Sequence, residues 1–293
     1  IYSIDKGTTH CVSNGLFNDF NPVFSTDGEH LLFISNRRFN PTFCDFDWEM
    51  VYKKMAGIYA ITLRKDGPSL FPLKSDEVEI SDDKDESKKE EKEIRVKIEF
   101  EDITERVEAF PLPRGNYRYL TANESGIFYL NKDEGDFNKF EFRKIGPRNL
   151  YSFSFEIQKE NLVLEKIDSY KLSANGNHIV YQKGDKIGLI PSGETNSAGK
   201  ELDLSELKMW YNPLAEWKQI FNEAWRMERD FYYEPNMHGI DWDAMKVKYG
   251  KLLPHASCRQ DIRFIIGELI GELNTSHTYI YGGDRKREAE KVS

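Results

Sequence analysis

The sequence predicts a mainly β fold that ends in a small α-helical domain. A short β-hairpin pattern returns several times before residue 190, and after residue 212 the apolar residues recur at helical spacing. A polar stretch rich in Gly and Ser, residues 191–200, separates the two regimes. We therefore expect a β domain at residues 1–205 and a helical domain at residues 206–293.

The hairpin pattern consists of two β-like runs joined by a turn. One copy lies at residues 24–35 with an Asp-Gly turn, and another at residues 170–181 with an Asn-Gly turn. These dipeptides supply the positive φ angles that a tight hairpin needs. A weaker copy lies at residues 120–130. The repetition predicts that the β domain is built from successive copies of one supersecondary unit.

Further β-like runs follow each copy of the hairpin. They lie at residues 57–63 and 70–73, at 140–143 and 150–155, and at 187–190. Four short antiparallel strands per repeat are typical of the blades of a β-propeller. The sequence thus predicts about three blades, preceded by the end of another at residues 1–13. Because closed propellers have about four to eight blades, we expect a partial β-propeller that does not close.

The helical domain is predicted from capping residues and apolar spacing. Asn212 followed by Pro213 is typical of a helix start. Asp241 is expected to cap a second helix that Pro254 closes, and residues 257–260 form a capping-box pattern before a third. The first helix carries an apolar stripe that we expect to form the core, at Leu214, Trp217, Ile220, Phe221, Ala224, Trp225 and Phe231.

Charge and composition argue against several partners. The chain holds 41 Lys and Arg against 50 Asp and Glu and lacks a basic tract, so we expect no nucleic acid. Residues 76–93 carry ten acidic residues against four lysines, hence −6 of the net charge of −9. We interpret this segment as a solvated, mobile insertion. No run approaches the roughly 18 apolar residues of a membrane span, so we expect no membrane association.

The first residues and the cysteines bear on compartment and chemistry. Residues 1–5 resemble a strand rather than a signal peptide, which suggests a chain that begins inside a domain. Cys11, Cys44 and Cys258 are far apart and form no Cys-x-x-Cys pair, so we expect buried thiols without disulfides or zinc. Scarce cysteine fits the cytoplasm; a lost export signal would instead place the protein in the periplasm.

Residues 45–49 carry carboxylates at alternate positions, which could suit a hard cation. The glycine and the remaining ligands of a calcium loop are missing, so we interpret the segment as solvated or salt-bridged. We expect neither a metal nor a cofactor. The sequence also contains no Gly-x-Ser-x-Gly elbow, no His-Glu-x-x-His motif and no phosphate-binding Gly-Lys-Ser/Thr loop.

The surroundings of His277 distinguish it from the other histidines. An apolar helix is expected to end near Leu273, a short polar turn follows, and a β-like run begins after His277. The end of a rigid element can hold a general base, and the adjacent Ser276 could orient or polarise it. A histidine at a helix end is also common as a structural residue, so spacing alone leaves both interpretations open. The other five histidines show no local partner pattern.

Several segments, in the same order along the chain, resemble the tricorn proteases. Residues 36–41 with 45–48 resemble a segment of the seven-bladed propeller of these enzymes and their bacterial homologues. Residues 110–118, preceded by 98–103 and 106–107, resemble another. The family's small helical core domain is similar to residues 217–232, 241–242 and 271–277. The resemblance covers nearly the whole chain except the acidic insertion and the last ten residues.

This resemblance implies a serine peptidase that cleaves oligopeptides and is related to the tail-specific proteases. In the family, two propellers are followed by a helical core domain, a PDZ-like domain and a second, α/β core domain. The chain would then hold about half of one seven-bladed propeller and the first core domain. His277 would be the general base for a serine nucleophile, and Ser276 would set its orientation and tautomer. The nucleophile would belong to the second core domain, since no Ser within residues 1–293 matches its motif.

We therefore expect part of a tricorn-like serine protease that forms a homo-oligomer when full length. It would act on peptide substrates together with the missing PDZ-like and second core domains, and the propeller would guard access of short peptides. Alone, the chain is expected to be inactive. The alternative is a non-catalytic propeller module that binds a protein or peptide. An α/β-hydrolase peptidase is disfavoured, because its nucleophile elbow and residue order are missing.

Overall fold

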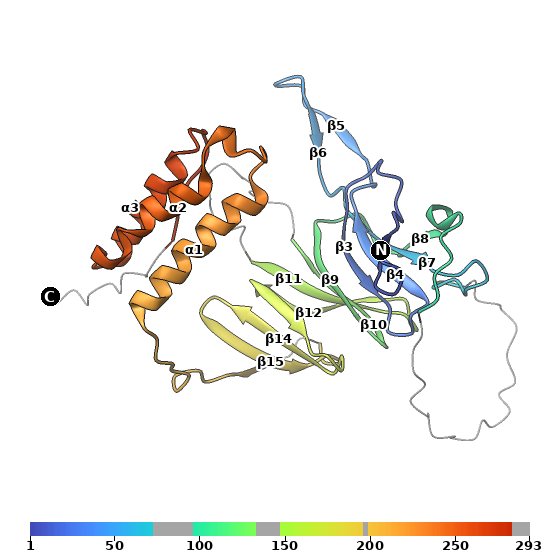
Figure 1. Cartoon of the computed structure of the whole chain (residues 1–293). Coiled ribbons are helices and arrows are strands. Elements are labelled where there is room, and N and C mark those ends of the chain that lie inside the picture. The colour runs from blue at the N-terminus through green and yellow to red at the C-terminus, as the bar shows by residue number, and fades with distance from the viewer. Residues whose placement is uncertain (73–95, 133–146, 196–198, 283–293) are drawn as a thin grey trace, which may run out of the picture. The chain divides into compact units, whose positions relative to one another are not determined.

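The computed structural model describes residues 1–72, 96–132, 147–195 and 199–282. The chain divides into two compact units, Ile1–Asp203 and Leu204–Ser293. Strands build the first unit and helices the second (Figure 1). The predicted fold class, a partial β-propeller followed by a small helical domain, is confirmed. The predicted acidic insertion, residues 76–93, lies outside the described residues.

Three four-stranded antiparallel sheets make up most of the first unit within the described residues. In each sheet the strands follow chain order, as in the blades of a propeller. The first sheet contains β3 (Asp19–Phe24), β4 (His30–Ser35), β7 (Gly57–Thr62) and β8 (Val107–Ala109). The second contains β9 (Tyr117–Asn123), β10 (Gly126–Asn131), β11 (Arg148–Ser154) and β12 (Glu160–Ile167). The third contains β13 (Ser169–Leu172), β14 (His178–Lys183), β15 (Lys186–Pro191) and β16 (Lys200–Glu201).

Two smaller sheets accompany them in the part of the chain that is described. β1 (Tyr2–Ser3) pairs with β2 (Thr8–Thr9), and β5 (Pro41–Phe43) pairs with β6 (Met50–Tyr52). The β5–β6 hairpin was not predicted from the sequence. It lies between the second and third strands of the first sheet.

The turns of the first and third sheets have the same construction, which explains the repeated sequence. Gly28 and Gly176 adopt left-handed φ angles of 73° and 72°, which glycine tolerates without a steric cost. In each turn a serine hydroxyl accepts a hydrogen bond from the backbone N–H five residues later, at 2.9 Å for Ser25 and 3.0 Å for Ser173. The predicted hairpins are therefore confirmed, with glycine alone supplying the positive φ angle.

The predicted strand at residues 70–73 is wrong over its described part, because β8 takes the fourth position of the first sheet. Leu70 donates its backbone N–H to the Glu108 carboxylate at 3.1 Å instead of pairing with a strand. The Phe71 ring packs edge-on against Phe110, with 4.9 Å between ring centroids. The segment thus caps the core instead of extending the sheet.

The second sheet agrees only in part with the expected strands. The expected strand at 150–155 corresponds to β11, whereas the run at 140–143 lies outside the described residues. β12, one of the two edge strands of this sheet, was not predicted. Its Val163 side chain is fully buried, so the strand contributes to the core as well as to the edge.

The core of the first unit lies between consecutive sheets. On β4, Leu32 and Ile34 join a cluster shared with the second sheet, whereas Leu31 and Phe33 face the opposite side. This alternation follows from the two-residue period of a strand. The cluster shared by the second and third sheets contains Phe128, Leu130, Leu150, Val163, Leu164, Ile167, Tyr170, Ile179, Tyr181 and Ile190.

The second unit holds α1 (Pro213–Phe231), α2 (Trp242–Gly250) and α3 (Arg259–Gly271). Asn212 Oδ1 accepts from the N–H groups of Leu214 and Ala215 at 3.1 and 3.3 Å, so the predicted cap of α1 is confirmed. Asp241 likewise caps α2, accepting from the Ala244 N–H at 2.9 Å. Short 3-10 turns lie at Met237–Gly239 (η2) and Leu253–His255 (η3) in this unit, and another lies at Ile103–Glu105 (η1) in the first unit.

The start of α3 differs by one residue from the predicted capping box. The N-cap is Cys258 rather than Ser257, and Asp261 occupies the third helical position. The Asp261 carboxylate accepts from the backbone N–H groups of Ser257 and Cys258 at 2.7 and 3.1 Å. An aspartate can satisfy these N–H groups better than Gln260, which explains the shift.

The apolar stripe of α1 is only partly buried. Phe221 and Trp225 lie in the core, whereas Leu214 and Phe231 at the helix ends are exposed. Trp225 and Trp242 each donate the indole N–H to the other's backbone carbonyl, at 2.9 and 3.0 Å. This reciprocal pair joins α1 to the start of α2. No helix in the described ranges is long and apolar enough to cross a membrane.

The prediction of buried cysteines is wrong. Cys11 and Cys258 are exposed, and Cys44 is half-buried; all three are free thiols. The Cys11 thiol donates to the Ser13 carbonyl at 3.0 Å, and Cys258 is the helix cap described above. All three lie outside the strands and helices, Cys258 as the N-cap of α3.

Candidate functional site

The candidate site is the turn that follows α3, residues 272–279. Its first residues continue the helix by one tight turn, since the N–H groups of Leu273 and Asn274 donate to Ile270 and Gly271 at 3.2 and 3.0 Å. The Leu273 side chain is fully buried in the helical core. The buried Leu273 side chain therefore fixes the position at which the turn begins.

Ser276 and His277 lie at the tip of this turn, and both are exposed. The His277 backbone is left-handed, with φ at 63°, and its ring meets the edge of Tyr279 at 6.3 Å between centroids. The predicted β-strand after His277 is wrong for residues 278–282, because no described strand pairs with them. Within the described residues, neither Ser276 nor His277 forms a side-chain hydrogen bond.

A hydrogen-bond network around His238 holds the root of the turn. The Tyr233 hydroxyl lies 2.6 Å from His238 Nε2, and His238 Nδ1 lies 3.4 Å from the Leu273 carbonyl oxygen. The Tyr232 hydroxyl contacts both His238 and Thr275, and the Thr275 hydroxyl donates to the Leu273 carbonyl at 3.0 Å. These contacts fit an imidazole protonated on Nδ1, which donates to Leu273 and accepts from Tyr233.

A charged contact holds the same root from the side of α2. The Glu272 carboxylate binds the Lys248 ammonium and the Tyr249 hydroxyl, both at 2.5 Å. These two donors lower the pKa of Glu272, and the same carboxylate raises the pKa of Lys248. Glu272 is therefore ionised at neutral pH and ties the end of α3 to α2.

Backbone strain is concentrated in the loop after α1 and in the turn after α3, which meet at His238. Met237 and His238 have φ angles of 51° and 55°, and Asn274 and His277 have 49° and 63°. Non-glycine residues in this left-handed region cost on the order of 1 kcal/mol each, and such residues are common at functional sites. The network described above fixes a conformation that the local sequence would not favour.

The comparisons with known proteins reveal the family. The family model "Tricorn protease second beta propeller domain" matches residues 1–193, well over half of the chain. The family model "Tricorn protease C1 domain" matches residues 200–271. The chain belongs to the tricorn protease family.

Curated tricorn relatives cover most of the chain. Tricorn protease homolog 1 of Streptomyces coelicolor is 26% identical over 279 residues, which is 90% of this chain and 26% of that protein. The Putative Tricorn-like protease C-terminal subunit of Sulfurisphaera tokodaii is 28% identical over 269 residues, 89% of this chain and 29% of that protein. The chain therefore spans about a quarter of the length of these relatives.

The fold is shared with a solved structure. The crystal structure of the tricorn protease superposes with a TM-score of 0.73 at 20% sequence identity. The match covers 96% of this chain and 26% of that one. Because the C1 match ends at residue 271, Ser276 and His277 lie just beyond it. Their roles in this tricorn-family chain therefore depend on the geometry of the turn and on the resemblance of residues 271–277.

The network around His238 could not be inferred from its spacing. No partner pattern surrounds His238 in the sequence, yet the Tyr232 and Tyr233 hydroxyls both contact it across a short turn. Two consecutive tyrosines five and six residues before a histidine are a weak local signal. The contact with Leu273, 35 residues away, requires the fold itself.

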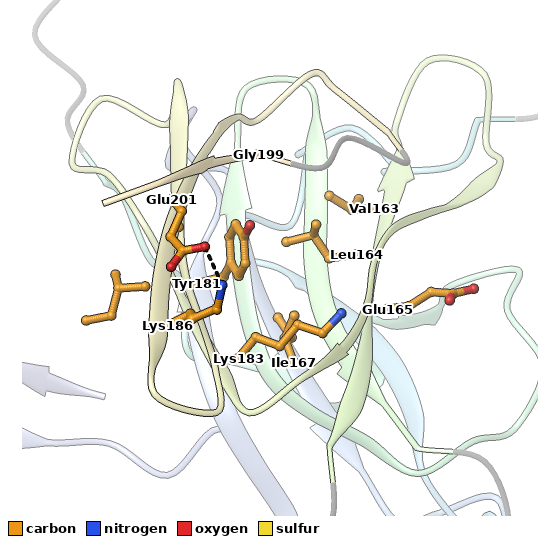
Figure 2. A pocket seen from close by; sticks show the side chains of 11 residues that line it. Val163, Leu164, Glu165, Ile167, Tyr181, Lys183, Lys186, Gly199 and Glu201 are labelled. Carbon is orange, nitrogen blue, oxygen red and sulfur yellow. Dashed lines mark hydrogen bonds and ion pairs between the residues drawn. The ribbon is translucent and has the colours of Figure 1, made fainter. Parts of the chain in front are cut away.

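The tricorn-like propeller unit contains a separate pocket of about 420 Å³ (Figure 2). It lies between β12 of the second sheet and strands β14 to β16 of the third. Tyr181 lines it, as do Lys186 and Glu201, which pair at 2.8 Å. No Ser, Cys or His lines the pocket, so its walls offer no serine or cysteine nucleophile and no imidazole base. In the described ranges no group of three or more His, Cys, Asp and Glu could hold a metal ion.

Proposed function

We propose that this chain is part of a tricorn-like serine peptidase and supplies His277 as its general base. The observation that carries the proposal is an exposed imidazole at the tip of a turn whose root is fixed by Leu273 and the His238 network. A general base must be both accessible and held in place. The relatives named as tricorn proteases support the same reaction class.

The chemistry follows the usual division of labour in acyl transfer. His277 would take the proton from a serine hydroxyl as that oxygen attacks the peptide carbonyl, and would return it to the departing amine. Ser276, next in the chain, would bond one ring nitrogen and so set the tautomer. In the family the nucleophile and the oxyanion-hole amides come from another core domain. Residues 1–293 would thus contribute one part of a divided active site.

The test uses the complete reading frame that contains this chain, assayed with fluorogenic oligopeptides. His277→Ala is expected to lower kcat/KM by about 10³-fold or more, within the range for loss of a general base. His255→Ala removes another exposed imidazole of the same unit and should leave the rate unchanged. Ser276→Ala should lower kcat while leaving KM close to that of the wild type.

Equal activity of His277→Ala and His255→Ala would contradict the proposal. If the complete protein has no peptidase activity but binds peptides or a protein through its propeller, the binding-module alternative holds instead. Peptide substrates, oligomeric assembly and the PDZ-like and second core domains are parts of the same proposal. They are tested by the same complete protein.

A further inference from the structure

The pocket between the second and third sheets has a buried apolar base (Figure 2). The base is supplied by β12, whose residues Val163, Leu164 and Ile167 line the pocket. Val163 and Ile167 are fully buried, Leu164 is 8% exposed, and all three belong to the core cluster shared by the two sheets. At about 420 Å³ the pocket lies within the range of small-molecule sites, about 300–1,000 Å³. The base therefore offers apolar contact to a ligand of that size.

Two glycines of the third sheet define where the Tyr181 ring lies in the pocket. A Cβ atom at Gly188 would lie 2.3 Å from the ring carbon Cζ of Tyr181, and one at Gly199 would lie 2.7 Å from its hydroxyl oxygen. A side chain at either position would therefore displace the ring. Because both positions are glycine, the ring stays in place and adds aromatic surface to the apolar base.

One lysine of the pocket has a charge that no carboxylate compensates. Lys183 and Lys186 are directly opposed in the β14–β15 pairing, where like charges destabilise a sheet. The Lys186 ammonium group pairs with Glu201 at 2.8 Å, whereas Lys183 forms no ion pair within the described residues. Lys183 points across the pocket, and the Glu165 side chain points away from it (Figure 2). An anion bound in the pocket would therefore meet the uncompensated charge of Lys183.

Hydrogen bonds hold the turn that carries Lys183. The Gly184 backbone N–H donates to the Asp168 carboxylate at 2.6 Å, and the Gln182 side-chain amide donates to the Gly184 carbonyl at 3.0 Å. Asp168 directly follows β12, so the first bond ties the tip of the β14–β15 hairpin to the strand that supplies the apolar base. The backbone of Lys183 is thus fixed relative to that base, while its exposed side chain can still adjust to a ligand.

We propose that this pocket binds a small hydrophobic carboxylate, with its apolar body on the β12 side chains and the Tyr181 ring and its carboxylate on the Lys183 ammonium group. A neutral molecule of the same shape lacks the charged contact, and an amine would be repelled by Lys183. A medium-chain fatty acid and the apolar carboxyl-terminal residue of a short peptide share this chemistry. The site lies entirely within Ile1–Asp203 and uses none of residues 272–279, so it does not depend on the peptidase chemistry.

The experiment titrates the 293-residue chain, labelled at its Ile, Leu and Val methyl groups, with octanoate and with its neutral analogue octanol, and follows the methyl NMR signals. The signals of Val163, Leu164 and Ile167 should shift, and that of Leu269 in the helical core should not. At low ionic strength octanoate should bind about fivefold more tightly than octanol, as one exposed charge contact allows. Acetyl-leucyl-leucine is titrated in the same way. The tighter of the two carboxylates identifies the source as a free acid or a peptide terminus.

Substitution of Lys183 separates the charged contact from the apolar one. Lys183→Met should abolish the preference for octanoate and leave the affinity for octanol unchanged, and Lys183→Glu should bind octylamine more tightly than octanoate. The control Lys171→Met removes another exposed lysine of the third sheet and should change neither affinity. Equal affinity of the wild type for octanoate and octanol overturns the proposal, as does a preference that survives Lys183→Met. Methyl shifts confined to residues outside the pocket, or no shift with either carboxylate, overturn it as well.

Discussion

His238 is one of the residues that contact the root of the candidate site. Its imidazole lies within hydrogen-bond distance of the Tyr233 hydroxyl and of the Leu273 carbonyl oxygen, which joins the loop after α1 to the end of α3. It also occupies a left-handed backbone position. A substitution that changes both features would therefore mix backbone strain with the loss of hydrogen bonds.

The variant His238→Asn separates these two effects, because asparagine tolerates the left-handed region. We expect the free energy of unfolding to fall by about 1 kcal/mol, the usual contribution of a hydrogen bond. Urea denaturation of the chain measures it, with His255→Ala as a control that changes stability by less than about 0.5 kcal/mol. Equal stability of His238→Asn and the wild type would show that the network does not hold the turn.

At the scale of single residues, the sequence predicted a turn at Ser276 and His277 but not the contacts that hold this turn in place. The end of α3 could be read from the apolar spacing that stops near Leu273. The partners of His238 come from segments that only the tertiary fold brings together. The same limit applies to Cys11 and Cys258, because their exposure depends on the tertiary fold rather than on the residue type.

Among the elements, β10 and β11 approach each other closely at Gly126. A Cβ atom at Gly126 would lie 2.0 Å from the Phe153 carbonyl oxygen, and backbone cannot move aside as a side chain can. We expect Gly126→Ala to destabilise the protein by at least about 2 kcal/mol, in the range for overpacking. Gly193→Ala, where nothing lies within 4 Å, should be nearly neutral. Equal denaturation midpoints for Gly126→Ala and Gly193→Ala would contradict the close approach of Gly126 to the Phe153 carbonyl.

The start of α3 makes a prediction about pH. Hydrogen bonds from Ser257 and Cys258 lower the pKa of Asp261 in the folded state. Stability that depends on a lowered pKa is present above the unfolded value of about 3.9 and is lost as the pH falls through the folded value. Asp261→Asn should therefore melt below the wild type at pH 7, and the gap should close below about pH 4. A gap that persists at low pH would contradict this account of the cap.

The strands that the sequence predicted are those whose own residues, such as a glycine turn, indicate a hairpin. The hairpins at β3–β4 and β13–β14 have a glycine turn that needs no tertiary context. β8 has none, because it follows β7 by more than forty residues and is recognised only by pairing with it. The sequence therefore favours the apolar run at 70–73 as the fourth strand of the first sheet. In the structure, residues of this run instead contact Glu108 and Phe110.

On the scale of the whole molecule, the chain consists of a strand unit and a helical unit. The change from strand to helix periodicity in the sequence predicted these two units, and the structure divides the chain after residue 203. The chain spans about a quarter of the length of its tricorn relatives. The exposed imidazole of His277 has no hydroxyl partner among the described residues.

We therefore expect the 293-residue chain to show no turnover of fluorogenic oligopeptides above the buffer rate. A histidine without a nucleophile and an oxyanion hole in the same geometry has little power in acyl transfer. The assay is run at high protein concentration, with His277→Ala as the reference for contaminating activity. Turnover by the wild type that His277→Ala abolishes would show that the chain is catalytically complete.

The clusters between consecutive sheets have a consequence for how the propeller unit unfolds. One cluster is shared by the first and second sheets, another by the second and third, and the Tyr170 hydroxyl also donates to the Phe128 carbonyl at 2.8 Å. Such a series behaves as a one-dimensional array, in which each interface stabilises only its two neighbours. The middle sheet is supported on both faces, whereas the third has an outer face on which Val180 is 40% exposed. Loss of structure should then spread inward from that end, one blade at a time, with the slowest amide exchange in β9 to β12.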